Sequence, residues 1–223
     1  MTSKLFCQAV LKFILGVVGI GVLIFLPAGT FHYWNAWLLM GILFIPMFFV
    51  GIVMLFKNPD LLRKRLNSKE QQSEQRLVIK LSGLMFIFGF VIAGLDFRFK
   101  WIILPNWVSW TAAVVFLFSY LLYAEVLREN TYLSRIVEVQ KGQKVIDTGV
   151  YGIVRHPMYS ATLILFLSIP LILGSVLSFV IFLAYPVIIA KRIRNEEAVL
   201  EKDLAGYSEY KKKVKYKIIP FVW

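Results

Sequence analysis

Apolar runs of about twenty residues recur along this chain, and they restrict its possible folds more than any other feature. A helix that crosses a bilayer needs ~20 predominantly apolar residues, and four runs reach this length, near residues 8–28, 34–56, 77–95 and 107–127. The chain of 223 residues is 59% hydrophobic and only 17% charged, which leaves too few polar side chains to cover a soluble domain. We therefore predict an all-α, polytopic helical membrane protein.

Two shorter apolar segments follow these runs, residues 160–174 and 176–190, on either side of Gly174-Ser175. Each has about 15 residues, or ~22 Å of helix, which is less than the ~30 Å hydrocarbon core. We expect about four full spans and then a short helical hairpin over residues 160–190. Pro170 and Pro186 should kink it, because each removes an intrahelical hydrogen bond. The sequence leaves open whether the hairpin crosses the bilayer.

Positive charge gathers in the polar segments between the apolar runs. The chain has 25 Lys+Arg against 13 Asp+Glu, a net charge of +12. Lysine and arginine beside spans mark the cytoplasmic face and attract anionic lipid. We thus expect both termini to lie at the cytoplasmic face, together with the segments 57–76, 128–159 and 191–223. The first of these segments includes Lys69. Membrane lipids are the expected partners of this charge, and nucleic acid is not.

Several kinds of site are missing from the sequence. No glycine-rich nucleotide loop follows a strand, and Gly16, Gly19 and Gly21 lie inside an apolar run where small residues suit helix packing. No spacing of histidine, cysteine and acidic residues suits a metal ion, so no metal site is expected. Nothing resembling a G-x-S-x-G motif indicates a serine nucleophile.

The first cluster with chemical potential is "VIDTGVYGIVRHPMYS", residues 145–160. Pro157 suits the first turn of the following helix, and His156 would precede this helix, whose free N–H groups attract negative charge. Tyr151 and Tyr159 offer aromatic faces to a cation or an adenine ring. A plainer alternative stays open, in which the tyrosines anchor the chain at the membrane interface and His-Pro merely begins a helix.

The second cluster is "AKRIRNEEAVLEKDLAGYSEYKKK", residues 190–213. Arg192 and Glu196 are four residues apart, so they should share one face of a helix. They would offer a guanidinium to an anionic substrate group and a carboxylate to a cofactor amine. Glu197 and Glu201 repeat the spacing, and a charged helix face in water is the alternative interpretation.

The order and spacing of four pieces resemble one known family. "GVYGIVRHPMY", a hydrophobic hairpin, "RIRNEEAVL" and "YSEYKKKVKYKIIPF" are similar to the isoprenylcysteine carboxyl methyltransferase (ICMT) family of integral membrane methyltransferases, with phospholipid methyltransferases as relatives. "FKNPDLLRKRL" is similar to bacterial members. The chain departs from the pattern at Gln143, where eukaryotic members can have histidine, and at Ala161, where glycine is common.

The resemblance implies S-adenosylmethionine (SAM) as methyl donor, bound in a pocket that faces the cytosol. It implies one integral membrane domain, residues 1–223, in which 1–127 supply the N-terminal spans and 128–223 the catalytic, cofactor-binding region. Glu196 would bind the amino end of the cofactor and Arg192 would orient the acceptor, with Arg155 as a second catalytic residue. The remaining cofactor-binding residues would be Gln143, Lys144, Val145, Ile146, Tyr151, His156, Pro157 and Tyr159.

The expected reaction is methylation of a lipidic acceptor. The resemblance implies that the methylated group is the carboxylate of a prenylated cysteine. A phospholipid or small-molecule N- or S-methyltransferase is an alternative. So is a membrane reductase that uses NADPH. A transporter or assembly protein is a further class, although Asp96 and Glu125 lie near span ends and outline no buried ionisable pathway. The acceptor and the oligomeric state stay open.

Overall fold

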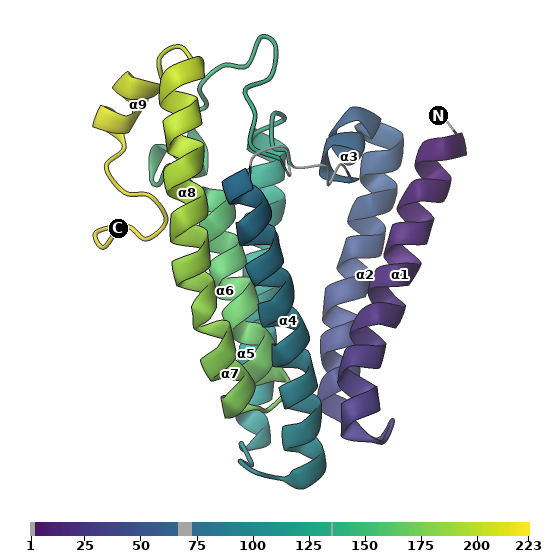
Figure 1. Ribbon diagram of the computed structural model, residues 1–223. Helices are drawn as coiled ribbons and strands as arrows, with labels where there is room; N and C mark the ends of the chain where they lie inside the picture. The colour runs from purple at the N-terminus through teal and green to yellow at the C-terminus, as the bar shows by residue number, and fades with distance from the viewer. Residues whose placement is uncertain (1–2, 67–72, 135) are drawn as a thin grey trace.

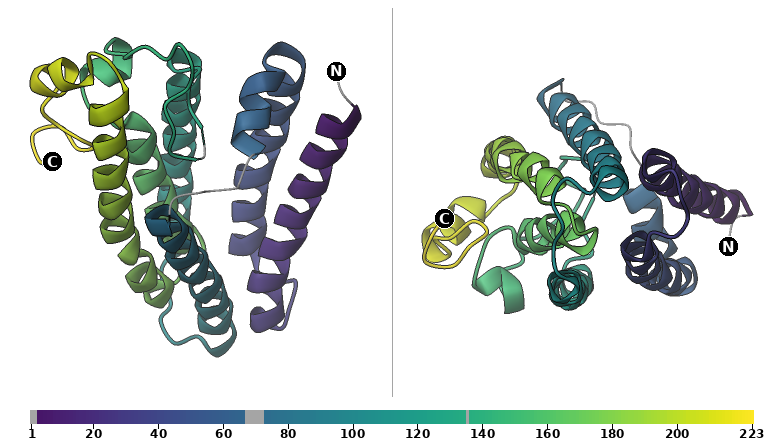
Figure 2. Two further views of the ribbon diagram at one scale, coloured as in Figure 1. Left: turned by 45° about the horizontal axis from the view of Figure 1, so that its top comes forward. Right: turned by 90° about the horizontal axis from the view of Figure 1, so that it is seen from below.

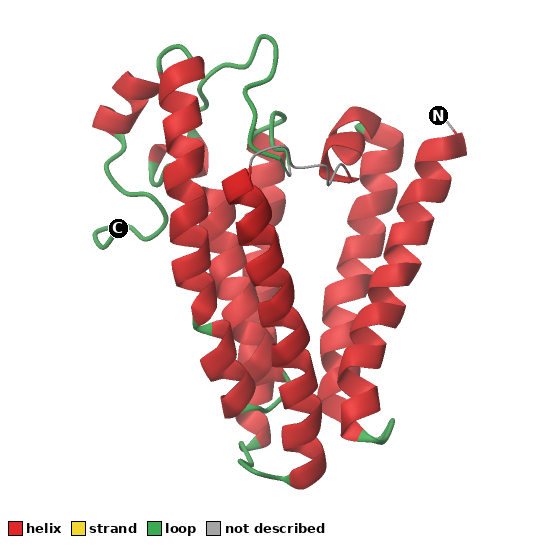
Figure 3. Cartoon of the chain, viewed as in Figure 1, coloured by secondary structure: helices red, strands yellow, loops and turns green. Residues whose placement is uncertain are grey.

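The computed structural model describes residues 3–66, 73–134 and 136–223, and these ranges fold into a helical bundle without strands (Figure 1, Figure 3). The predicted all-α class is confirmed. The expected loop position Lys69 lies outside the described residues. The elements are α1 (Ser3–Ala28), α2 (Trp34–Lys57), α3 (Pro59–Leu66), α4 (Ser73–Phe99), α5 (Asn106–Glu129), the 3-10 helix η1 (Gly149–Gly152), α6 (Pro157–Ile172), α7 (Val176–Phe182), α8 (Ala184–Asp203) and α9 (Tyr207–Lys213).

Five helical segments of the described chain are long and apolar enough to cross a membrane. Four of them, in α1, α2, α4 and α5, confirm the spans predicted from the sequence. The fifth is Val176–Asp203, 28 residues formed by α7 and α8 together. The second arm of the hairpin was therefore predicted too short at 176–190. Its helix continues because residues 191–203 contain no glycine or proline and are rich in good helix formers.

The first arm of the hairpin, α6, is short as expected. Its 16 residues make ~24 Å of helix, and Pro170 lies inside it. Gly174, at φ +74°, forms the turn into α7, where the Ser175 hydroxyl accepts a hydrogen bond from the N–H of Ser178 (3.1 Å). The second arm is interrupted at Leu183, between α7 and α8. Pro186 explains this break, because it lacks the N–H that would bond one turn back.

Three short helices, α3, η1 and α9, were not predicted, because their segments were expected to form polar loops. Residues 57–76 were expected to form a polar loop, but Pro59–Leu66 forms α3. Asn58 accepts a hydrogen bond from the N–H of Leu61 (3.2 Å) at the start of this helix, as a capping side chain does. Leu62 is buried against α1 and α2 residues, and Lys12 of α1 donates to the carbonyl of Leu66 (2.5 Å). These contacts fasten α3 to the first two helices.

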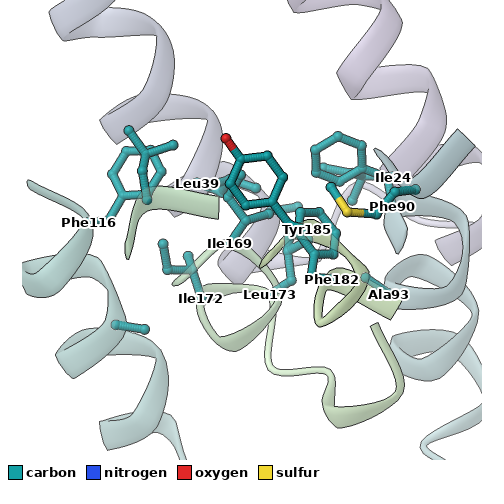
Figure 4. Close-up of a cluster of buried hydrophobic side chains, with 14 of the residues drawn as sticks. Ile24, Leu39, Phe90, Ala93, Phe116, Ile169, Ile172, Leu173, Phe182 and Tyr185 are labelled. Atoms are coloured by element: carbon teal, nitrogen blue, oxygen red, sulfur yellow. The ribbon is translucent and has the colours of Figure 1, made fainter. Parts of the chain in front are cut away.

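The bundle core joins residues from most of the long helices. Figure 4 shows this cluster, in which Phe182 of α7 meets Phe90 of α4 and Ile169 of α6 lies close by. Helices α5 and α6 lie side by side, and α1 packs along α4 (Figure 1, Figure 2). Gly89 permits the approach of α4 to α7, because a Cβ there would lie 2.3 Å from the Phe182 ring.

The two ends of the bundle differ in composition. The basic segments gather at the upper end in Figure 1, where α3, the loop after α5 and α9 lie. Exposed tryptophans, the interfacial anchors of membrane proteins, occur in the segments at the opposite end, at positions 34, 37, 101, 107 and 110. The protein is thus a polytopic membrane bundle with one polar, basic end. The candidate site lies at this end.

Candidate functional site

The stretch that links α5 to α6 is fixed by contacts with the end of α5. Glu129, the last residue of α5, accepts a hydrogen bond from the N–H of Val150 (3.1 Å). Gly149 lies directly against that carboxylate at φ +52°, and a Cβ there would be 1.5 Å from a Glu129 oxygen. Asn130 donates to the Tyr151 hydroxyl (3.0 Å). We call residues 150–160, which continue from η1 into the first turn of α6, the wall segment.

A buried carboxylate on α8 holds the middle of the wall segment. Glu197 accepts a hydrogen bond from Nε of Arg155 at 2.8 Å, and Nε2 of His156 lies 3.1 Å from the same oxygen. Nζ of Lys217 lies 3.2 Å from the other oxygen. Arg155, His156 and Glu197 are each at least 94% buried. Three nitrogen-bearing side chains from two segments thus converge on one carboxylate.

The C-terminal segment is bonded to the same two wall residues. The N–H groups of Arg155 and His156 donate to the carbonyls of Tyr216 (2.9 Å) and Lys217 (2.8 Å). Nη1 of Arg155 also donates to the carbonyls of Val214 and Lys215 (2.7 and 2.8 Å). This geometry favours a positioning role for Arg155 over the catalytic role expected for it, because its guanidinium joins α8, the wall segment and the C-terminal segment.

The side chains of the adjacent residues Glu196 and Glu197 point in different directions. The Tyr159 hydroxyl donates to Glu196 Oε2 (2.5 Å) and accepts from Nε of Arg192 (2.8 Å). Arg192 and Glu196 therefore lie on one face of α8, as their spacing predicted, with a buried tyrosine between them. Glu197 faces Arg155 and His156 instead. Adjacent helical residues point about 100° apart, which accounts for the division.

Ten of the eleven expected site residues surround one recess at the basic end. They are the segment 143–146 with Tyr151, Arg155, His156, Tyr159, Arg192 and Glu196. The recess has a cavity volume of about 100 Å³ and is partly open to solvent. Pro157 does not line this recess. It is buried in the first turn of α6 and faces a second, apolar hollow behind the wall segment.

Sequence reasoning missed two tyrosines of α9 that line the recess. Tyr210 donates to the carbonyl of Tyr151 (2.7 Å). The Tyr207 hydroxyl is buried, and no hydrogen-bond partner for it occurs among the described residues. Burial raises the pKa of both phenols well above 10, so each stays a neutral O–H group. Their i, i+3 spacing in "YSEY" was the available signal, because such residues share a helix face.

Glu197 was also missed, because its i, i+4 spacing to Glu201 resembled an exposed charged face. The two residues differ in their partners: Glu201 pairs with Lys211 of α9, and both side chains are 39% exposed. Glu197 contacts residues 42, 41 and 20 positions away. A single sequence gives little indication of such distant partners.

The recess therefore presents an uncommon set of groups side by side. It offers a carboxylate (Glu196), a guanidinium (Arg192), a buried hydroxyl with no partner among the described residues (Tyr207) and a non-helical segment, 143–146. Among the described residues no group of three or more histidine, cysteine or acidic side chains could hold a metal ion. The site is thus suited to a ligand with both cationic and polar parts.

Comparison with known proteins shows which family this part of the chain resembles. Residues 110–202 match the model of the isoprenylcysteine carboxyl methyltransferase (ICMT) family. The resemblance inferred from the sequence is confirmed there, and the matched residues run from α5 through the wall segment to Glu196 and Glu197 on α8.

Two individual proteins are similar over different extents. The structure of a eukaryotic intramembrane Ras methyltransferase, ICMT, matches 91% of this chain and 74% of its own, with a TM-score of 0.56 and 19% sequence identity. At this identity the likeness concerns the fold. The mouse Delta(14)-sterol reductase TM7SF2 is 35% identical over 85 residues, 37% of this chain. The chain spans about a fifth (20%) of the length of that curated relative.

Proposed function

We propose that this protein is a SAM-dependent methyltransferase that acts on a lipidic acceptor at the cytoplasmic membrane face. Carboxyl O-methylation of an isoprenylcysteine-like substrate is the specific reaction proposed. The observation that carries the proposal is the linked set Arg192, Tyr159 and Glu196 in one recess, within the segment that matches the ICMT family.

The residues of the recess fit the polar groups of SAM. Glu196 provides a negative charge for the ammonium of the amino acid part. Tyr207 provides a buried hydroxyl that has no described partner, and a buried polar group of this kind gains from a ligand that bonds to it. The backbone of residues 143–146 and the face of Tyr151 are left for the nucleoside. We assign these residues, with His156 and Tyr159, to cofactor binding.

Bound SAM supplies an activated methyl group on a sulfonium. A carboxylate acceptor is already ionised at neutral pH, so the protein has no need of a general base. Its residues instead hold the two reactants in line and exclude water. Arg192 orients the acceptor carboxylate by charge-assisted hydrogen bonding. Tyr159 keeps the guanidinium and Glu196 at a fixed separation.

The position of the recess suits an acceptor with a greasy part. It lies at the basic end of the bundle, which the positive-inside rule assigns to the cytoplasm. The polar reagent then arrives from water, and the lipid part of the acceptor stays among the helices. These two routes of access explain why a polar cluster lies at the end of an apolar helical bundle.

Binding measurements separate the roles of the two charged residues on α8. In isothermal calorimetry with S-adenosylhomocysteine, Glu196→Gln should weaken affinity by ~10–100-fold, the value of a hydrogen bond to a charged group. Arg192→Ala should keep affinity within about threefold and lose turnover of a prenylcysteine acceptor. Glu201→Gln, on the same helix, is the matched control. Unchanged affinity in a folded Glu196→Gln protein would remove the proposed cofactor site.

A second candidate function rests on the 35% identity to the mouse sterol reductase over 85 residues. In that case the recess would bind NADPH rather than SAM. Calorimetry with NADPH in place of S-adenosylhomocysteine distinguishes the two classes. Within the methyltransferase class, an amine acceptor must lose a proton, so its rate should rise with pH. A carboxylate acceptor should give a flat profile between about pH 6.5 and 9.

A further inference from the structure

A second cavity lies behind the wall segment and plays no part in the proposed reaction. Its lining comes from α5, η1, residues 153 and 154, the first two turns of α6 and residues 218–220, and its cavity volume is about 410 Å³. Every lining side chain is apolar except that of Ser160. The Ser160 hydroxyl already donates to the carbonyl of Ile218 (2.6 Å). The hollow therefore offers a ligand apolar surface and no unused side-chain polar group.

The hollow and the cofactor recess share the wall segment between them. His156 and Tyr159 line the recess, whereas Val154, Pro157 and Ser160 line the hollow. These positions alternate along the segment, so its two faces serve two cavities. Whatever fills the hollow packs against the back of the residues assigned to the cofactor.

The hollow is lined in part by α5, a helix long and apolar enough to cross a membrane. Leu122, which lines it, lies seven residues before the end of α5 at Glu129, or ~10 Å along the helix axis. On α6, Ile164 lines it and is 42% exposed. The outer surface of α5 near Leu122 is also apolar, because Phe118 and Leu121 are each 67% exposed.

The C-terminal turn adds exposed apolar residues beside the hollow. Phe221 and Val222 are 87% and 74% exposed, and Phe221 has a φ of +65°, which is rare for an aromatic residue. The turn is closed by hydrogen bonds between Ile219 and Trp223 (3.0 Å). Figure 1 shows it reaching down beside α8 from α9 toward the middle of the bundle. Strained backbone that displays apolar side chains in this way suits insertion into a membrane.

Basic residues flank the apolar turn on its aqueous side. Residues 205–223 contain five lysines and one glutamate. Lys211, Lys213 and Lys217 have acidic partners, and Lys212 and Lys215 are exposed. Lysines beside an apolar membrane contact attract anionic headgroups.

From these observations we propose a resident lipid site. The hollow holds an acyl chain of an anionic bilayer phospholipid, and the exposed Lys212 and Lys215 face its headgroup. The lipid supports the wall segment from behind. It is distinct from the methyl acceptor, which must reach the recess on the other side of the wall.

Photo-crosslinking in nanodiscs tests this site without donor or acceptor, so failure of the methyltransferase proposal leaves the test intact. The discs contain phosphatidylcholine with a small fraction of phospholipid that carries a diazirine on its acyl chain, as phosphatidylglycerol or as phosphatidylcholine. Peptide mass spectrometry should find adducts within residues 150–164 and 218–222. The anionic probe should give about fivefold more of them.

A variant that fills the hollow provides the control. Leu163→Trp should abolish these adducts, and Ile164→Trp at the rim should do so if the first variant does not fold. Val187→Trp, at a position 74% exposed on α8, should leave them unchanged. Adducts spread over the outer faces of α5 and α6, and unaffected by filling, would overturn the site. So would displacement of the probe by a farnesylated acceptor, and equal labelling by both headgroups would overturn its anionic character.

Discussion

Replacing Glu197 by alanine should destabilise the protein more than any other single change on the outer half of α8. The carboxylate is 5% exposed and its partner Arg155 is 4% exposed. Removal leaves the guanidinium buried without its counter-charge, and His156 without a partner for Nε2. Because breaking one side of a buried ion pair leaves an uncompensated charge, its cost exceeds the net value of the pair.

The magnitude follows from the contacts that remain. Breaking a buried pair costs about 3–5 kcal/mol. Arg155 keeps its bonds to the carbonyls of Val214 and Lys215, so we expect the lower end, about 3 kcal/mol. A loss of 1 kcal/mol lowers Tm by about 2–4 °C in a chain of this size. Tm should therefore fall by roughly 6–12 °C.

Thermal unfolding in detergent measures this loss, with Glu201→Ala as the matched control. Glu201 is on the same helix and pairs with Lys211, but both side chains are 39% exposed, so its loss should cost less than about 1 kcal/mol. The Glu197 variant should also be cut more readily by trypsin after Lys217, because this lysine loses the carboxylate that pairs with it. Equal Tm values for the two variants, with no new cleavage, would refute the view that Glu197 fastens the wall segment.

Three further changes test other parts of the structure. Tyr207→Phe should leave Tm within about 1 °C, since the hydroxyl has no described partner, and should weaken S-adenosylhomocysteine binding by ~5–10-fold in calorimetry. Gly89→Ala should lower stability by about 1–3 kcal/mol through overpacking against Phe182, as thermal unfolding will show, whereas Gly41→Ala meets open space and should not. Hydrogen exchange of residues 143–148 tests the pair between Lys213 and Asp147 (2.8 Å), whose hydrogen bond lowers the pKa of that carboxyl. Because the folded pKa of Asp147 is lowered, the pair stabilises the protein above the unfolded value of 3.8, and this stabilisation is lost as the pH falls through the folded value. The protection that Lys213→Ala removes at pH 7 should therefore shrink once the pH falls below 3.8.

Much of the fold could be predicted because the bilayer imposes length and composition on each span. The limits of α1, α2, α4 and α5 follow from apolar runs that end at prolines or charges. The length of the second hairpin arm could not be obtained in this way. Hydropathy falls after residue 190, but the helix continues, since backbone propensity and not apolarity decides where a helix ends in water. The helix α3 depends on the buried contact of Leu62 with the first two helices.

The candidate site was predictable to the extent that its residues lie in contiguous motifs. "GVYGIVRHPMY" and "RIRNEEAVL" supply six of the ten expected residues that line the recess, and the segment 143–146 supplies the other four. The roles within the motifs were harder to assign. Arg155 and Glu197 resemble surface charges until the fold brings them together from 42 residues apart. Tyr207 stands out only when the absence of a described partner for its hydroxyl is known.

The bonds from residues 214–217 to Arg155 and His156 have a consequence for biosynthesis. Proteins emerge from the ribosome from the N-terminal end, so these residues appear after every candidate span has been made. The helices can insert and begin to pack while the wall beside the recess still lacks its last support. The membrane anchor of this protein is therefore assembled before its chemistry, and a nascent chain stalled before residue 214 would be embedded in lipid and unable to hold a ligand in the finished geometry.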